Sequence, residues 1–483
     1  MSDLSRRALL GRAAAGAAAA SALPFRPLFA ADAATLGDVV RVAVCGVKGR
    51  GGNHIDEWLG MKDVQVVGVC DVDEVVIKEV MKKVEQKNGK APRYEKDWRK
   101  MMEDKSIDAV SVATCNHTHT LLGIWAVQAG KHAYVEKPCS HNVWEGRKLV
   151  EAARKYKRCV QHGTQKRSSG GYYSLAAFLK AGTLGKVSVS RGLCYKRRTS
   201  IGKKPDGTPP PTVDYDLWLG PAPSRPFNPN RFHYNWHWNW DYGCGDIGNQ
   251  GVHEMDVARW LLGVGLPKSV VSLGGRFGYE DDGETPNTQI VCFDYGDGRQ
   301  IIFEVRGLDT SGYKDAAIDL KNVKIDNIVH AEKGYAVGAG AFGPGGAKVA
   351  VDTKASPPGP GGHFRNFIEA VKADNPKLLN AEILEGHLSS ALCHLGNISY
   401  RLGEPVPFDA TKTPFGKNDA GNETFERMCA HLKENEVDLS KTKYRMGPVL
   451  AFDPEKETFP ANDAACKLLR RDYRPPFVVP ENV

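Results

Sequence analysis

Residues 38–140 alternate short runs of β-branched residues with helical stretches, and this rhythm restricts the possible folds more than any other feature. Neighbouring parallel strands need a long crossover, usually a helix, so the alternation favours an open parallel sheet with helices on its faces. The predicted strands cover residues 39–46, 64–71, 108–114 and 132–135, and the predicted helices cover 53–61, 74–87, 97–104 and 119–129.

The first predicted strand ends in a glycine-rich turn that opens directly into a helix. Gly46 and Gly51 hold the first and third positions of G-x-G-x-x-G, where glycine permits a tight turn and close helix–strand packing while the helix N-terminus faces a pyrophosphate. Lys48 replaces the middle glycine, so its side chain must point away from the phosphates or place its ammonium near them. Asp71, 20 residues after Gly51, is the carboxylate expected to bind an adenosine ribose. Because no Arg or Lys follows Asp71 directly, NAD is favoured over NADP.

The sequence changes character after about residue 160. Several stretches show apolar positions in alternation, and Gly-Asp-Gly at 296–298 is typical of a tight turn, so a mainly antiparallel sheet is expected. Its predicted strands cover residues 185–195, 268–280, 287–295 and 299–308, its predicted helices cover 363–373 and 382–401, and the Pro/Gly-rich stretches 205–229 and 338–362 are predicted loops that can cover a site.

The chain is too long for one hydrophobic core, because 483 residues exceed the size at which a single core stops growing. Two folded domains and two terminal segments are expected. We assign residues 1–33 to an export signal, 34–160 to a nucleotide-binding domain, 161–410 to a substrate and oligomerisation domain, and 411–483 to an extension that packs on the second domain.

Charge and cysteine patterns exclude several classes of protein. The formal net charge of +8 is spread along the chain with no block of five or six like charges, so a nucleic-acid partner is not indicated. The 11 cysteines form no C-x-x-C pair, which argues against a zinc ribbon or a thioredoxin-like site. Buried, unreactive thiols are the simpler expectation.

Two long motifs resemble the Gfo/Idh/MocA oxidoreductases. The first runs from Asp108 to Pro138 and ends in Glu-Lys-Pro, and the second is Gly-Asp-Ile-Gly-Asn-Gln-Gly-Val-His-Glu-Met-Asp-Val-Ala-Arg-Trp at 245–260. The resemblance covers about residues 38–405. It implies an N-terminal Rossmann domain with a doubly wound sheet, and a C-terminal α/β domain whose large sheet often mediates oligomers. A homo-oligomer formed through that sheet is therefore expected.

Hydride transfer from a carbinol needs a group that receives the hydroxyl proton and a cation that stabilises the oxygen. By resemblance, Lys137 is the family's active-site lysine and His253 is the acid/base, with Glu136 holding a junction in which Pro138 is often cis. The family often has Asp four residues before this histidine, but this chain has Asn249, whose amide cannot take a proton. Proton transfer therefore depends more heavily on Lys137 and His253.

Residues 231–242 place three tryptophans two apart among histidine, asparagine and aspartate. This mixture suits a polyol site, because aromatic faces stack on the C–H face of a sugar while polar groups bind its hydroxyls. A strand whose tryptophans cover a domain junction is an equally good interpretation. No metal site is predicted, since His233 and His237 lack further ligands. The predicted substrate contacts are Asn249, Trp236, His237, Tyr242, Gln165 and Arg167, and the predicted cofactor contacts are Gly46, Lys48, Gly49, Arg50, Gly51, Asp71, Thr114, Asn116, His119 and Glu136.

The first 33 residues have the composition of an export signal. The paired Arg6 and Arg7 precede an alanine-rich stretch, residues 13–23, that is too short to span a bilayer. The pattern resembles a bacterial twin-arginine signal, which implies export to the periplasm of a folded protein, without stable membrane insertion once the signal is removed. An ordinary signal with a chance arginine pair is the alternative.

A sugar or polyol oxidoreductase is the favoured function. Because free NAD is scarce outside the cytoplasm, the cofactor is expected to be tightly held and regenerated in place. One alternative is an NAD-dependent glycosidase that works by transient oxidation, elimination and re-reduction, with His253, His237 or Tyr242 removing a carbon-bound proton. Another is a carbohydrate-binding protein that retains NAD without catalysis.

Overall fold

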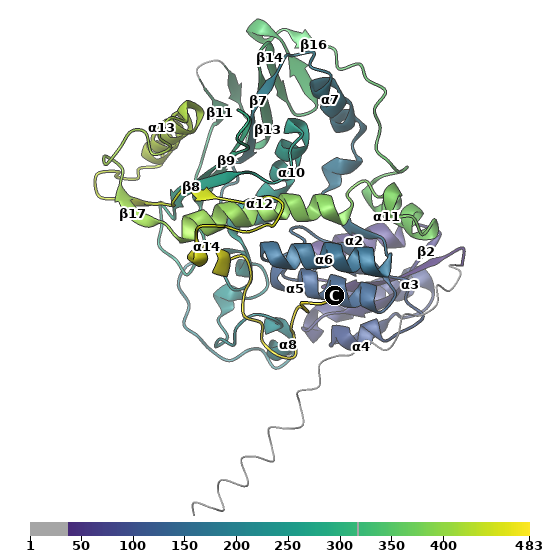
Figure 1. Cartoon of the computed structure of the whole chain (residues 1–483). Helices are drawn as coiled ribbons and strands as arrows, with labels where there is room; N and C mark the ends of the chain where they lie inside the picture. The colour runs from purple at the N-terminus through teal and green to yellow at the C-terminus, as the bar shows by residue number, and fades with distance from the viewer. Residues whose placement is uncertain (1–36, 316–317) are drawn as a thin grey trace, which may run out of the picture.

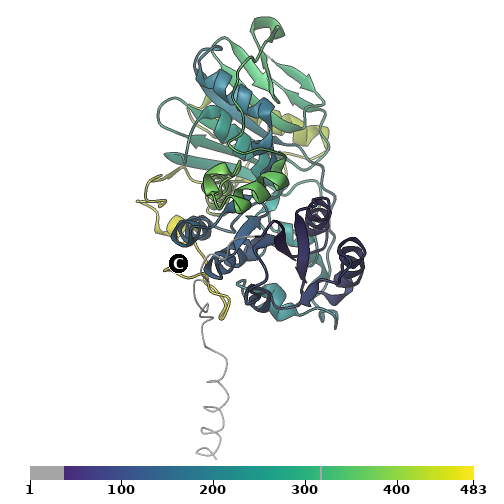
Figure 2. The same ribbon diagram turned by 90° about the vertical axis from the view of Figure 1, so that its right-hand side faces the viewer.

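The computed structural model describes residues 37–315 and 318–483, which form two sheets covered by helices (Figure 1). The predicted export signal, residues 1–33, lies outside these residues. Helix α12 runs between the two sheets, with the first domain on one side and the second sheet on the other (Figures 1 and 2).

The first sheet contains six parallel strands in the order β3-β2-β1-β4-β5-β6. The order reverses between β1 and β4, and in such sheets ligands bind beyond the carboxyl ends of the strands at that point. The strands are β1 (Val40–Cys45), β2 (Val64–Cys70), β3 (Arg93–Glu95), β4 (Ala109–Val112), β5 (His132–Val135) and β6 (Val160–His162), and the crossovers contain α2 (Arg50–Leu59), α3 (Glu74–Asn88), α4 (Trp98–Met102), α5 (Asn116–Gln128) and α6 (Val143–Tyr156).

Helices cover both faces of this sheet because its strands are apolar on both sides. In β1, Val42 and Val44 join a cluster that includes Ile55 of α2, whereas Ala43 and Cys45 join a cluster on the opposite face. Successive strand residues point to opposite faces, so a continuous apolar run places apolar side chains on both faces of the sheet, and both must be covered. The predicted doubly wound Rossmann fold is confirmed.

The second sheet is mixed and has 11 strands, of which only β7 and β10 pair in parallel. The predicted mainly antiparallel sheet is therefore confirmed, although two of its strands, β15 and β16, fall within a segment predicted to be a loop. The strands are β7 (Val187–Cys194), β8 (Ser269–Gly275), β9 (Thr288–Asp294), β10 (Gln300–Arg306), β13 (Ile325–Ala331), β14 (Gly334–Val337), β15 (Gly340–Phe342), β16 (Lys348–Val349), β17 (Glu404–Pro407), β18 (Lys443–Met446) and β19 (Leu450–Ala451), while β11 (Gly312–Lys314) and β12 (Asp319–Lys321) form a separate hairpin.

Helices pack on both faces of the second sheet as well. Ile301 and Phe303 of β10 share a cluster with α10 and α12, whereas Ile302 shares one with Met428 of α13 on the other face. The helices of this part of the chain are α7 (Gly170–Lys180), α8 (Tyr215–Leu219), α9 (Gly245–Asn249), α10 (Gly251–Leu262), α11 (His363–Lys372), α12 (Ile383–Arg401), α13 (Asp419–Glu434) and α14 (Asp463–Lys467).

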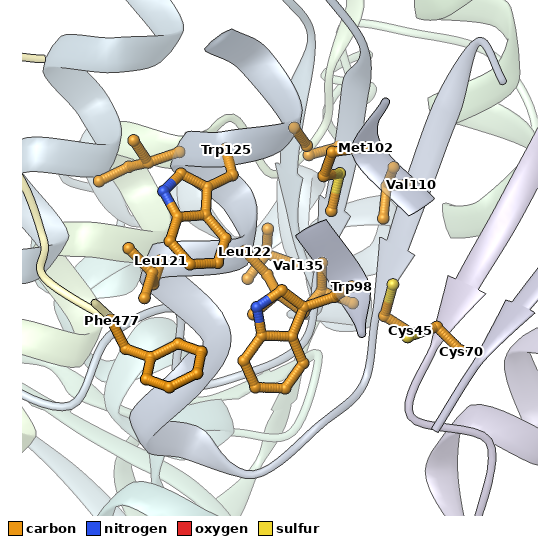
Figure 3. Close-up of a cluster of buried hydrophobic side chains, with 14 of the residues drawn as sticks. Cys45, Cys70, Trp98, Met102, Val110, Leu121, Leu122, Trp125, Val135 and Phe477 are labelled. Carbon is orange, nitrogen blue, oxygen red and sulfur yellow. The ribbon is translucent and has the colours of Figure 1, made fainter. Parts of the chain in front are cut away.

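The extension after residue 410 contacts both domains. Strands β18 and β19 pair with β8, so this part adds to the second sheet. The chain then crosses to the first domain, where Phe477 packs among Trp98, Leu121 and Trp125 (Figure 3). Residues 411–483 were predicted to pack on the second domain, but in the structure they contact both domains. The other domain boundaries stay predictions.

A long connection between β7 and α9, residues 195–244, reaches from the second domain to the first, and we call it the cover loop. Asp214 N donates to the Val72 carbonyl at 2.9 Å, and Glu74 N donates to the Thr212 carbonyl at 3.1 Å. These bonds attach the cover loop to the segment that follows β2, so α8 lies beside the first domain (Figure 1).

Candidate active site

A cavity of about 390 Å³ opens at the carboxyl ends of the first sheet. The cover loop forms its other wall, so side chains from both domains face the same space. From the cover loop come Trp218, Phe232, His233, Tyr234, Trp236 and His237, and from the first domain come the glycine turn, Asp71, Asp73, Thr114, Asn116, His119, Glu136 and Lys137.

The glycine turn has the geometry that its spacing predicts. A Cβ on Gly46 would lie 2.6 Å from the Ala113 carbonyl oxygen, and a Cβ on Gly51 would lie 1.7 Å from the Gly46 carbonyl oxygen, so any side chain would force the turn open. No side chain caps the N-terminus of α2, and Gly49 and Arg50 at that terminus line the cavity. Free amides at a helix N-terminus suit a pyrophosphate. These features fit NAD.

Asp71 lies beside this turn at the end of β2. Its Oδ2 accepts the Val47 amide at 2.9 Å, and its Oδ1 accepts the Asp73 amide at 3.1 Å. Burial raises the pKa of Asp71, although these two amide bonds oppose the rise. The carboxylate therefore connects the glycine turn to the wall where a ribose is expected.

Asp73 and Lys48 define the rim near Asp71. The Asp73 carboxylate lies 3.2 Å from His233 Nε2 of the cover loop and accepts the Thr212 hydroxyl at 3.1 Å. Lys48 is exposed, and its charge adds to the effect of burial in lowering the pKa of His233. Two carboxylates at this rim favour a ribose hydroxyl over a phosphate, which supports NAD over NADP.

Glu136 is almost fully buried at the end of β5. Its Oε1 accepts Arg50 Nε at 2.8 Å and His54 Nε2 at 3.1 Å, and its Oε2 accepts the Lys137 amide at 3.0 Å. Burial alone would raise the pKa of Glu136, but the His54 hydrogen bond and the nearby charges of Arg50 and Lys137 hold it well below its usual value. This anion fixes the backbone from which Lys137 projects.

Lys137 reaches across the domain boundary. Its Nζ donates to the Asn249 carbonyl at 2.6 Å and to Asn249 Oδ1 at 3.4 Å, and the Lys137–Pro138 peptide is cis. An ammonium carries three protons, so these two acceptors leave one for a substrate oxygen. Burial lowers the pKa of Lys137, and the charge of Glu136 opposes the shift. Asn249 thus positions the lysine.

His253 lies about one helical turn after Asn249. Burial and the charge of Lys137 lower the pKa of His253 to about 3, so the imidazole is neutral at neutral pH and close to the lysine. The cavity wall includes Lys137 and Asn249 but not His253. Lys137 and Asn249 thus face the cavity, and the catalytic role of His253 stays a prediction.

His237 is a second neutral imidazole at the cavity wall. Its Nδ1 donates to the Tyr234 carbonyl at 2.5 Å, because a carbonyl oxygen can only accept. This fixes the tautomer and leaves Nε2 as the lone-pair nitrogen. Burial lowers the pKa of His237 to about 3, and the ring stacks on Trp236 at 3.6 Å between centroids.

The remaining predicted cofactor contacts also line the cavity. Thr114 and Thr118 hydroxyls share a hydrogen bond of 2.7 Å, and Asn116 Oδ1 accepts the Cys244 thiol at 3.6 Å. His119 bridges the carbonyls of Pro138 and Thr114 at 2.7 and 3.0 Å. His119 therefore ties the cavity wall to the peptide that carries the active-site lysine.

Three predicted substrate contacts are not brought to the cavity. Tyr242 is fully buried among aromatic rings, and Arg167 is buried in an ion pair with Asp256 at 2.8 Å. Gln165 lines a separate hollow with Arg50 and donates to the Tyr134 hydroxyl at 3.2 Å. Tyr242, Arg167 and Gln165 therefore do not face the nucleotide cavity.

The alternative interpretation of residues 231–242 as a strand is wrong. The cover loop forms short 3-10 turns at Pro229–Arg231 and Asn235–Trp238, so its side chains do not alternate between two faces. Trp236 lines the cavity, whereas Trp238 lies under Arg198 at 4.9 Å and Trp240 under Arg401 at 5.2 Å.

Several cavity residues were not predicted from the sequence. Asp73 could have been predicted, because it lies two residues after Asp71 in the turn between β2 and α3. Trp218, Phe232 and Tyr234 are aromatic residues in a loop, and only the folded path of that loop brings them to the cofactor side.

Residues 37–315 and 318–483 contain neither a membrane-spanning helix nor a cluster of metal ligands. No helix there is both long and apolar enough to cross a bilayer. Within the same ranges, no group of three or more His, Cys, Asp or Glu side chains is arranged to hold a metal ion. All 11 cysteines, which lie in these ranges, are free thiols.

Two models of one protein family match the chain. The model described as oxidoreductase family, NAD-binding Rossmann fold, matches residues 40–164, and its C-terminal α/β domain matches residues 180–329. Together they span more than half of the chain. The predicted NAD cofactor is confirmed by the first match.

Curated relatives match part of the chain. Glycosyl hydrolase family 109 protein 1 of Bacteroides thetaiotaomicron is 32% identical over 129 residues, 26% of this chain and 28% of the relative. Myo-inositol 2-dehydrogenase of Thermotoga maritima is 29% identical over 224 residues, 46% of this chain and 55% of the relative. The chain thus matches between about a quarter and just over half of the length of these proteins.

Solved structures share the fold over most of the chain. The WlbA dehydrogenase from Bordetella pertussis, in complex with NADH and UDP-GlcNAcA, has a TM-score of 0.54 at 18% identity and covers 75% of this chain and 97% of its own. A levoglucosan dehydrogenase in complex with NADH and levoglucosan has a TM-score of 0.53 at 16% identity, with coverages of 74% and 95%.

Proposed function

Because the chain belongs to the Gfo/Idh/MocA oxidoreductase family, we propose that it transfers hydride between NAD and a hydroxyl-bearing carbon of a sugar or polyol. The observation that carries this proposal is the position of Lys137, which lines the nucleotide cavity and donates to Asn249 of the second domain, four residues before His253. The relatives support the substrate class, since a curated one is a myo-inositol dehydrogenase and a solved one was crystallised with levoglucosan.

The chain's own residues account for every proton in the reaction. Gly46, Gly51 and Asp71 would hold NAD, which supplies or takes up the hydride when bound. The free N–H of Lys137 binds the reacting oxygen and stabilises its negative charge as the C–H bond breaks. Neutral His253 accepts the hydroxyl proton and returns it in the reverse direction. Because the cavity wall includes the cover loop, water is partly excluded from these charges.

A hydrolytic cycle is the second candidate, and His237 favours it. Oxidation of a sugar hydroxyl acidifies the neighbouring C–H, and a neutral base must then remove that proton before the glycosidic bond breaks. His237 Nε2 is such a base, because Nδ1 donates to the Tyr234 carbonyl. A curated relative belongs to glycosyl hydrolase family 109. In this cycle the same hydride returns to the sugar.

Free sugars and aryl glycosides separate the two candidates. Purified protein is denatured to identify any released nucleotide, and the native protein is mixed with each substrate. An oxidoreductase changes nicotinamide absorbance with one substrate, whereas a glycosidase releases the aryl group with no net change. Lys137→Met should lower both activities about 10²- to 10³-fold while nucleotide stays bound. Activity retained by this variant would remove the lysine from the mechanism.

We further propose that NAD is tightly held. The cover loop closes the cavity and is attached to the first domain beside Asp73, so release of the nucleotide requires those bonds to break. His233→Ala removes the side-chain contact to Asp73 and should speed the release of NAD. Release at the rate of the unaltered protein would refute this role of the cover loop.

Export to the periplasm through the twin-arginine pathway is a proposal that rests on residues 1–33 alone. Replacing Arg6 and Arg7 by lysine should leave the protein in the cytoplasm if this signal is used. Export of the double variant at the normal rate would favour an ordinary signal.

Assembly into a homo-oligomer through the second sheet is proposed as well. Helix α13 covers part of the sheet face opposite α10, so the contact would use the part of that face on β14, where Tyr335 and Val337 are only partly buried. The molar mass in solution tests this proposal, and a monomer at all concentrations would refute it.

A further inference from the structure

Beyond the predicted contacts, the second domain places two more lysines near His253. Lys196 follows β7, and its Nζ donates to Gln250 Oε1 at 3.1 Å. Gln250 Nε2 donates in turn to Glu254 Oε2 at 3.4 Å, and Glu254 Oε1 lies 3.4 Å from Lys166 Nζ. A single polar chain thus links the two ammonium groups at the start of α10.

Both lysines lie near the proposed reaction centre. The charges of Lys137 and Lys166 add to burial in lowering the pKa of His253, and the charge of Lys196 acts in the same way on Lys137. Through their contacts, Lys137 and Lys196 reach the consecutive residues Asn249 and Gln250, and Lys166 reaches Glu254 one turn further along α10. Lys137 comes from the first domain, whereas Lys166 and Lys196 come from the second.

Positive charge exceeds negative charge in this cluster. Within residues 37–315 and 318–483, Lys196 has a neutral amide as its acceptor and forms no ion pair. Lys166 faces Glu254, whose pKa burial raises to about 7, so that this carboxylate is only partly ionised at neutral pH. Asp326, which accepts the Tyr172 hydroxyl at 3.4 Å, is the other acidic group near Lys166.

The carboxylate of Glu254 is buried, whereas the ammonium group of Lys166 is partly exposed to solvent. The Glu254 side chain is 1% exposed, whereas that of Lys166 is 29% exposed. Lys196 is also partly exposed. Asn249 lines the cavity and Gln250 follows it, so a ligand that extends from the cavity toward the start of α10 meets ammonium groups rather than the carboxylate of Glu254. A neutral polyol leaves this charge uncompensated, while an anion completes it.

We propose that the substrate is a sugar or polyol carrying a negatively charged group, which Lys166 and Lys196 bind while Lys137 holds the reacting oxygen. This inference rests on the proposed function, because it assigns the substrate class of the same site. The shared chemistry is an anionic substituent, which a uronate supplies as a carboxylate and a sulfated sugar supplies as a sulfate ester. The lysines act in specificity and do not exchange the reacting proton.

Binding of matched sugar pairs to the nucleotide-bound protein tests the inference. The pairs are glucose with glucuronate, galactose with galacturonate, and glucose with glucose 6-sulfate, measured by calorimetry at low and high salt. At least one acidic sugar should bind about tenfold or more tightly than its neutral partner, and added salt should reduce this preference. If the uronates show the larger preference, the anionic group of the substrate is a carboxylate. If glucose 6-sulfate shows the larger preference, that group is a sulfate ester.

Lysine variants locate the effect. Lys196→Gln and Lys166→Gln should each lower the preference for the acidic sugar about tenfold, as expected for a hydrogen bond to a charged group. Lys441→Gln is the matched control, because it removes the same charge from a side chain that is 85% exposed and paired with Asp438. Thermal unfolding shows whether each variant is folded.

The outcomes separate this inference from the proposed function. If no acidic sugar binds more tightly than its neutral partner, or if Lys441→Gln lowers the preference as much as the other variants, the inference is overturned. If acidic sugars are preferred but no hydride moves with any of them, the binding site stands and the proposed reaction fails.

Discussion

Replacement of Asp71 tests the nucleotide site most directly. Asp71→Ala removes the carboxylate expected to bind the ribose, and hydrogen bonds to a charged group contribute about 1.5–3 kcal/mol. It also removes the acceptor of the Val47 amide at 2.9 Å, which loosens the glycine turn. The affinity for NAD should therefore fall by about 10- to 150-fold.

Asp71→Asn separates the two contributions. Its amide oxygen can still accept from Val47, but its NH₂ group faces the Asp73 amide, which is also a donor. The glycine turn should stay closed while the negative charge is lost. The ratio of NAD affinity to NADP affinity should therefore fall by a larger factor than the NAD affinity itself. Glu79→Gln, an exposed change on α3, is the control.

Affinities are measured by titrating nucleotide into protein from which the bound nucleotide has been removed. Thermal unfolding without nucleotide reports any damage to the fold. If Asp71→Ala binds NAD as tightly as the unaltered protein, the ribose assignment is wrong. If Asp71→Asn keeps the full preference for NAD, the carboxylate does not set that preference.

Three further results are expected. Lys137→Met should lower kcat about 10²- to 10³-fold in single turnovers, the usual cost of losing an oxyanion donor, and an unchanged kcat would contradict its role. Because burial lowers the pKa of Lys137, its protonated form should be lost as the pH rises through a value below 10.5, so kcat should fall on that alkaline limb, and Lys137→Arg should not show this limb. Glu136→Gln should destabilise the fold by about 2–3 kcal/mol in urea, less than the usual cost for a buried pair because Arg50 is 42% exposed. Folding lowers the pKa of Glu136, so its contribution to the free energy of unfolding is present above the unfolded pKa of 4.5 and is lost as the pH falls. If the stability of Glu136→Gln falls with decreasing pH as steeply as that of the unaltered protein, this assignment is wrong.

Local spacing was enough to predict the nucleotide end of the site. Gly46, Gly51 and Asp71 are fixed by the turn after one strand and the end of the next, and both features depend on short segments. Lys137 was identified differently, through the resemblance of the Glu-Lys-Pro motif to that of the family. Adjacent segments of a parallel sheet bring such residues together whatever the rest of the chain does.

The substrate side was harder to predict because it depends on contacts between distant segments. The aromatic alternation at 231–242 resembled a strand, but the segment follows the surface of the first domain in 3-10 turns. Tyr242 and Arg167 are buried away from the cavity, and no local sequence pattern indicates which aromatic or charged side chain will be buried. Lys196 is one lysine among many in the sequence, and only its place after β7 makes it notable.

The packing of Phe477 against Trp98 (Figure 3), with Val479 in the same cluster, sets the order in which the molecule can mature. Both residues belong to the core of the first domain, although they are translated long after its six strands. Until they emerge from the ribosome, the nucleotide-binding half lacks part of its interior and exposes apolar surface to the cytosol. A ligand that binds only the finished fold would reach its site after translation has passed residue 479, which makes occupancy by the nucleotide a measure of completed folding.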